Sequence, residues 1–150
     1  MQITEIRVRL VPDNGQRLKA YCTVTLDSEF VVRDLKIIEG NNGLFVAMPS
    51  RKLADRCNKC GAKNHLRARF CNECGAKLAE NRILRDEQGK PKLNIDIAHP
   101  IDSSCRQRFE HQIIEAFNKE LHDSKQPGYK PKGDDQLNDF FLMSQHESPD

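Results

Sequence analysis

The chain has 150 residues, of which 37% are hydrophobic and 31% charged, and its formal net charge is +2. This length suits one ordinary domain, or a small domain with a metal-held module. No apolar run is long enough to cross a membrane, and the first residues alternate polar with apolar rather than forming a signal peptide, so we expect a protein of the reducing cytoplasm with no membrane partner.

The first 50 residues predict an antiparallel β-meander. Side chains alternate between apolar and polar along several segments, which is typical of strands with one buried face. Short turn signals rich in Gly, Asn and Pro separate these segments. Because short turns join neighbouring antiparallel strands, we expect four paired strands at residues 6–11, 18–26, 30–38 and 44–48.

Two near-identical segments, Cys57–Lys63 and Cys71–Lys77, then interrupt the strand pattern. Each places two thiols two residues apart, with a glycine after the second cysteine. Two such turns complete the closed four-sulfur shell of a structural zinc site. The glycines let the backbone turn sharply and aim N–H groups at the thiolates. The spacing therefore predicts a zinc ribbon that holds one Zn²⁺ through Cys57, Cys60, Cys71 and Cys74.

Other interpretations of the same segments are weaker. Two disulfides or a redox pair would use the same CxxC spacing, but such motifs rarely occur as duplicated turns in a chain without an export signal. His65 is close enough in sequence to replace one cysteine, yet four better ligands are available. Phe70 precedes the second segment, and we expect it in the small core of the ribbon rather than on the surface as a platform for stacking bases.

Positive charge is concentrated around the ribbon. Residues 51–92 hold 12 Lys/Arg and 5 Asp/Glu, whereas the other parts of the chain are neutral or acidic. Zn²⁺ with four thiolates carries −2, which leaves this region at about +5. Such a surface favours a polyanionic partner, although a merely solvated surface is the alternative. The candidate nucleic-acid contacts in the ribbon are Lys59, Lys63, Arg67 and Arg69, with Lys77 in the same basic set.

Beyond the ribbon, residues 86–91 predict a turn or linker. Leu93, Ile95 and Ile97 alternate, so we expect a short strand that returns to the main sheet there. Asp102, Ser103 and Ser104 are N-cap candidates. A helix should follow, with one apolar stripe facing the core, formed by Cys105, Phe109, Ile113, Ile114, Phe117 and Leu121.

The expected fold class is therefore α+β, an antiparallel meander with a C-terminal helix packed on it and a small zinc ribbon inserted in a hairpin connection. The core would comprise residues 1–52 and 93–122, and the ribbon with its linker residues 53–92. Cys22 and Cys105 should be free packing thiols rather than nucleophiles. Residues 123–150 predict a disordered tail, whose apolar cluster at residues 137–142 is alternatively a short segment that docks a protein.

Several residue runs resemble the stage V sporulation protein G family. They are Thr25–Asp27, Glu29–Asp34, Gly40–Lys52 and Asp96–Ser104. The resemblance implies a small bacterial regulator of septation and sporulation that binds DNA and RNA, with a dimeric sheet-and-helix fold. Ordinary members join the third run to the last by a short loop, whereas here that connection contains the ribbon.

The resemblance also implies where nucleic acid is bound. Matching basic positions are Arg51 and Lys52 after the Met-Pro-Ser segment, and Arg106 and Arg108 on the helix. Cations at these places would neutralise phosphates and carry little sequence information. For the two helix arginines the alternative is ordinary solvated charge, paired locally with Glu110.

We therefore predict a nucleic-acid-binding regulator rather than an enzyme. His99 has no accompanying serine, cysteine or carboxylate at a spacing typical of catalysis. A four-cysteine site also leaves no open coordination position for metal catalysis. The alternative of another class is a protein-interaction adaptor, in which the ribbon docks a partner and the core forms a dimer.

Overall fold

The computed structural model describes residues 1–131. They form two compact units, one built from Met1–Met48 and the chain from Pro100 onward, the other from Pro49–His99. Each unit has its own strand pairing and its own cluster of buried side chains. Residues 49–99 thus connect the last strand of the first unit to its helix.

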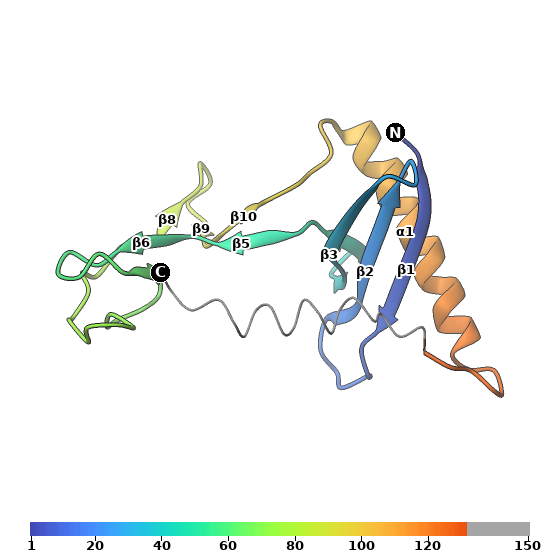
Figure 1. Cartoon of the computed structure of the whole chain (residues 1–150), viewed down its shortest axis with the longest axis horizontal. Coiled ribbons are helices and arrows are strands. Elements are labelled where there is room, and N and C mark those ends of the chain that lie inside the picture. Colours follow the sequence, from blue (N-terminus) through green and yellow to red (C-terminus); the bar gives the residue numbers. More distant parts are fainter. Residues whose placement is uncertain (132–150) are drawn as a thin grey trace. The chain divides into compact units, whose positions relative to one another are not determined.

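The first unit contains the predicted antiparallel meander (Figure 1). Its four strands pair in chain order, which confirms the expectation drawn from the alternating side chains. They are β1 (Ile3–Leu10), β2 (Leu18–Leu26), β3 (Phe30–Gly40) and β4 (Gly43–Ala47). Every second residue of a strand points to the same side of the sheet, so the alternating apolar residues gather on one face. The most completely buried side chains on this face include Val24, Leu35, Ile37 and Val46.

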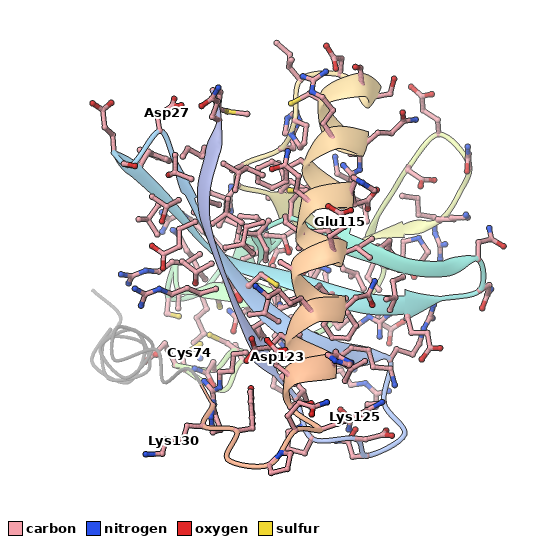
Figure 2. All side chains as sticks on the ribbon, turned by 90° about the vertical axis from the view of Figure 1, so that its right-hand side faces the viewer. Asp27, Cys74, Glu115, Asp123, Lys125 and Lys130 are labelled. Carbon is pink, nitrogen blue, oxygen red and sulfur yellow. The ribbon has the colours of Figure 1, made fainter. Side chains whose placement is uncertain are left out.

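The turn between β2 and β3 is held by the N-terminal residues. Asp27 and Ser28 have left-handed backbones, with φ of 51° and 54°. The carboxylate of Asp27 accepts a hydrogen bond from the N–H of Gln2 at 2.8 Å, and the N–H of Ser28 donates to Oγ1 of Thr4 at 2.9 Å. These contacts offset the cost of two left-handed residues. Figure 2 shows Asp27 at this end of the sheet.

The helix α1 (Ser103–Asp123) packs against the sheet and completes the core of this unit (Figure 1). Asp102 is the N-cap, and its side chain accepts a hydrogen bond from the N–H of Cys105 at 2.7 Å. Phe109, Ile113 and Phe117 are buried against the strands. Figure 2 shows Glu115 on the opposite face, where it pairs with His111 at 3.3 Å. The predicted helix and α+β class are thereby confirmed.

The C-terminal turns of α1 differ from the predicted stripe. Leu121 is 38% exposed, whereas Glu120 is buried. A spacing of four residues advances by about 40° more than one full turn, so the fourth step from Cys105 has rotated off the core face. Glu120 lies near the centre of that face. Its carboxylate accepts a hydrogen bond from the Tyr129 hydroxyl at 2.5 Å, which raises the pKa of Tyr129 to about 12.

The second unit is a series of short antiparallel pairs. β5 (Ser50–Lys52) pairs with β10 (Asn94–Asp96), β6 (Ala54–Arg56) with β7 (Lys63–His65), and β8 (Leu84–Arg85) with β9 (Pro91–Lys92). The prediction that the strand near residues 93–97 returns to the main sheet is wrong. Strand β10 has Ile95 opposite Arg51 of β5, so the segments before and after the twin cysteine turns pair with each other. Ile95 and Ile97 are exposed, so their alternation does not mark a core face.

Residues just after the helix make hydrogen bonds back to its last turn. Ser124 is the C-cap, and its N–H donates to the carbonyl of Glu120 at 2.9 Å. Tyr129 also returns to Glu120 through its hydroxyl group. Most of the predicted tail, residues 132–150 with the apolar cluster at 137–142, lies outside the described residues. Within residues 1–131, no helix combines the length and apolar character that a membrane crossing requires.

Candidate metal centre and basic surface

The four cysteines of the twin segments converge in the second unit. All four Sγ atoms lie within 4.8 Å of one another. The Sγ atoms of Cys57 and Cys74 are 3.8 Å apart, and those of Cys60 and Cys71 are 3.5 Å apart. A tetrahedral ion with bonds of about 2.3 Å to sulfur requires sulfur atoms about 3.8 Å apart. The predicted cysteines therefore have the separations that a four-sulfur metal site needs.

The two turns that present the cysteines have matching backbones. The N–H of Cys57 donates to the carbonyl of Ala62 and that of Cys71 to Ala76, each at 2.8 Å. Gly61 and Gly75 have φ of 76° and 72°, a left-handed conformation that glycine adopts without a steric cost. The N–H of Lys59 donates to Sγ of Cys57, and the N–H of Glu73 donates to Sγ of Cys71, both at 3.4 Å. The repeat in the sequence is thus a repeat of structure.

Asn64 is a supporting residue that the sequence predictions missed. It is buried, and its Nδ2 donates to the carbonyl of Ala62 at 3.2 Å and to Sγ of Cys71 at 3.5 Å. Its Oδ1 accepts from the N–H of Asn72 at 2.8 Å. One side chain therefore connects the first turn to the second and stabilises negative charge on a sulfur of the other turn.

Backbone and amide N–H groups lower the pKa values of thiols in the cluster, whereas burial and hydrogen bonds between thiols also raise some of them. For Cys71 the N–H of Cys74 has the largest effect, followed by the amide of Asn64, and the pKa falls to about 6. The N–H groups of Cys60 and Lys59 likewise lower the pKa of Cys57. For Cys60 the N–H of Ala62 acts downward, but neighbouring thiols and burial outweigh it and raise the pKa to about 11. The backbone thus favours thiolate, the form that binds metal, at one cysteine of each turn.

The small core of the ribbon does not include Phe70. It consists of the buried side chains of Cys57, Cys71 and Leu78, with three alanines packed against them. Phe70 is 61% exposed, so the prediction that it fills this core is wrong. The physical reason is the hairpin geometry, because Leu78 occupies the space beside the sulfurs and Phe70 lies on the outer side of the chain.

The basic residues predicted in this unit are solvent-exposed. These residues are Arg51, Lys52, Lys59, Lys63, Arg67 and Arg69. Within residues 1–131, none of their side chains makes a hydrogen bond or an ion pair. Arg82 behaves differently. Its guanidinium group donates to Asp55, and to the carbonyl oxygens of His65, Ala68 and Ala79. Arg82 is therefore a structural residue that fastens the chain after the second turn to the first hairpin.

The helix arginines belong to the other unit. Arg108 is exposed and donates from Nη1 to the hydroxyl of Ser104 at 2.9 Å, while Arg106 is half-buried. The local pairing with Glu110 that we considered does not form. Glu110 instead accepts a hydrogen bond from the N–H of Val46 at 2.9 Å, so it fastens the helix to strand β4.

The remaining candidates take other roles. His65 is exposed, and its Nδ1 accepts from the N–H of Arg67 at 3.3 Å, outside the group of four sulfurs. Cys22 is 2% exposed and packs in the core of the sheet, as predicted, and Cys105 is half-buried on α1. All six cysteines are free thiols.

Comparison with known proteins decides the family. The model of the SpoVG family matches residues 1–119, which include the four-stranded sheet, all of residues 49–99 and most of α1. The chain belongs to the SpoVG family. The resemblance expected from the residue runs is thereby confirmed.

Individual SpoVG relatives agree with this assignment. One from Anaeromyxobacter sp. (strain Fw109-5) is 36% identical over 133 residues, which cover 89% of this chain and 96% of the relative. One from Caldanaerobacter subterraneus subsp. tengcongensis is 39% identical over 119 residues, or 79% of this chain and 90% of the relative. One from Agathobacter rectalis is 37% identical over 121 residues, or 81% and 97%. Each is named "Putative septation protein SpoVG".

Proposed function

We propose that this SpoVG-family protein is a regulator of the septation type, without enzymatic activity, that binds DNA or RNA through the basic side chains of residues 49–99. The relatives named as septation proteins support the process. The charge of the unit supports the ligand, because residues 49–99 contain 12 Lys/Arg and 6 Asp/Glu. The proposal includes a cytoplasmic homodimer, whose mass in solution can be measured by light scattering.

The observation that carries the proposal is the separation of structural from available cations. Arg82 uses its donors internally, whereas Arg51 and Lys52 are exposed and make no polar side-chain contact within residues 1–131. Exposed Lys and Arg in such an excess lose little by binding phosphates and gain affinity through counterion release. Arg106 and Arg108 remain further candidates on the helix.

We further propose that one Zn²⁺ ion maintains this basic surface. The donor set fits the ion, because four sulfurs lie at tetrahedral separations and N–H groups support them. Bound there, Zn²⁺ would cross-link the two turns, and its four-sulfur shell would leave no position for catalysis. Cys57, Cys60, Cys71 and Cys74 would each contribute one bond. Metal analysis of the purified protein should give one zinc per chain.

The decisive test is binding to DNA and RNA in gel-shift titrations at several salt concentrations. We expect affinity to fall steeply with salt, and Arg51→Ala with Lys52→Ala to weaken binding to all sequences and to reduce the log–log salt slope by about 2. The matched control removes two exposed charges from the other unit, by Lys119→Ala with Lys125→Ala. No binding at low salt, or equal losses in both double variants, would refute the assignment to residues 49–99.

A second candidate function is a protein-interaction adaptor. Exposed apolar side chains in the same unit favour it, since Leu84 is 56% and Ile97 is 66% exposed. Deleting residues 56–79 separates the two candidates. If the deletion leaves nucleic-acid affinity unchanged, the ribbon takes no part in nucleic-acid binding, which favours the adaptor function for it.

A further inference from the structure

Phe70 is an exposed aromatic residue within the basic surface of the ribbon. It pairs with Lys77 in an isolated antiparallel bridge. Hydrogen bonds flank this pair on both sides, from the N–H of Cys71 to Ala76 and from the N–H of Leu78 to Arg69. Directly opposite residues in such a pair project from the same face, with Cβ atoms about 5 Å apart. The side chains of Phe70 and Lys77 therefore start from neighbouring positions on one face of the hairpin.

The sister turn shows that this aromatic residue is not required by the fold. There the equivalent pair is Arg56 with Lys63, in the same register. The ribbon therefore forms one turn with a polar residue at the position before its first cysteine and the other turn with Phe70. An exposed ring that the turn does not need is a candidate for contact with a ligand.

Phe70 also lines a cavity of about 1040 Å³ in the same unit. Cationic side chains line it with the ring, namely Arg67, Arg69, Lys77 and Arg85, against one carboxylate from Glu80. Arg82 also borders the cavity but donates to Asp55 and to main-chain carbonyls. Arg67, Arg69 and Lys77 make no polar side-chain contact within residues 1–131. The cavity thus offers one flat apolar face and several available cations.

We propose that this cavity binds one unstacked base of a single-stranded nucleic acid on the ring of Phe70, with its adjoining phosphates on Arg67, Arg69 and Lys77. The proposal rests on the proposed function and names its ligand as single-stranded. An aromatic ring beside a track of cations is the combination that binds single strands without sequence preference. In a duplex the faces of the bases are already stacked on one another, so the ring gains nothing there. An acidic peptide would satisfy the cations but would leave the ring without a flat partner.

The test compares three labelled probes on the full-length, zinc-loaded protein by fluorescence anisotropy. They are an oligothymidylate of about 12 nucleotides, an abasic strand of the same length, and a duplex. We expect wild-type protein to prefer the strand with bases over the abasic strand by about tenfold, the size of one stacked base. Phe70→Leu should remove this preference and leave affinity for the abasic strand and the duplex unchanged. Phe70→Tyr should retain the preference, and Leu84→Ala, an exposed apolar residue outside the cavity, should have no effect.

The outcomes distinguish this inference from the proposed function. If Phe70→Leu binds all three probes as wild-type does, or if wild-type protein binds the abasic strand equally well, the stacking site is refuted while salt-dependent binding still stands. If wild-type protein binds none of the probes at low salt, the proposed function fails together with the inference. Zinc content equal to wild-type in each variant shows that the ribbon is intact.

Discussion

Asn64 should control how tightly the ribbon holds its metal. Its side chain makes three hydrogen bonds, of which two join the first turn to the second: Nδ2 donates to Sγ of Cys71, and Oδ1 accepts from the N–H of Asn72. The corresponding position in the second turn is Leu78, which is buried without any such polar role. Asn64→Leu therefore introduces the side chain that the second turn has at the equivalent position, and it removes the polar contacts of Asn64.

The expected loss follows from the contacts themselves. Each net hydrogen bond contributes about 1 kcal/mol, and the N–H of Asn72 would lose its acceptor. Together these losses amount to about 2–3 kcal/mol. At 1.4 kcal/mol per tenfold change, this corresponds to about 30- to 140-fold weaker metal binding. That range overlaps the 10- to 100-fold typical of mutated residues that support metal ligands.

Competition with a chromophoric chelator would measure the zinc affinity, and the Co²⁺ spectrum would report whether the four-sulfur geometry persists. The control is Asn58→Ala, because Asn58 is an exposed asparagine of the first turn with no side-chain hydrogen bond within residues 1–131. It should bind as wild-type does. Equal affinities for Asn64→Leu and wild-type would show that the amide does not support the site.

Four further predictions concern Cys22, the helix and the metal-dependent order of residues 49–99. Burial raises the pKa of Cys22 from 9.0 to about 12, so in the folded, metal-loaded protein at pH 8 a thiol reagent should modify Cys105 and spare Cys22 until unfolding. The folded state holds the Cys22 proton more tightly than the unfolded chain does, so the contribution of this thiol to stability is fully present below pH 9. The free energy of unfolding should therefore fall as pH rises toward 12, and a rise in a thermal-melt series would contradict this. Ile113→Ala should destabilise the sheet-and-helix unit by about 2–5 kcal/mol in urea unfolding, whereas Leu121→Ala should cost well under half as much; equal losses would contradict the packing of α1. Chelation of the metal should disorder residues 49–99 in NMR spectra and leave the resonances of the four-stranded sheet in place, and loss of the sheet signals would contradict the division into two units.

Alternation of side chains was sufficient to predict the main sheet, because β2 and β3 each bury one face in the core cluster that the helix completes. The same signal failed for residues 93–97. A stretch that pairs with a single neighbouring strand and faces solvent can still alternate, so periodicity identifies a strand there but not its partner. The turn of α1 at Leu121 shows a similar limit, since a spacing of four residues follows a helix face for only a few turns.

The cysteine ligands were predictable because metal chemistry fixes their spacing, and the surrounding residues were less so. The sequence contains one indication that Asn64 has a special role. When the two turns are aligned, the first turn has the polar Asn64 where the second turn has Leu78. The prediction that Phe70 lies in the core follows from the usual burial of aromatic residues. In the structure, two cysteines, a leucine and small alanines already fill that space. Composition does not reveal how little room such a core has.

The pairing of β5 with β10 has a consequence for redesigning the chain. Residues 52 and 94 lie directly opposite each other, so the segment 53–93 begins and ends at neighbouring points about 5 Å apart. A two-residue turn of the Asn-Gly type would close the same hairpin if residues 53–93 were absent. The segment between these strands can therefore be removed or exchanged as a cassette in the laboratory, without any change in the strands that frame it. A form of the chain without the ribbon can be built by that one replacement.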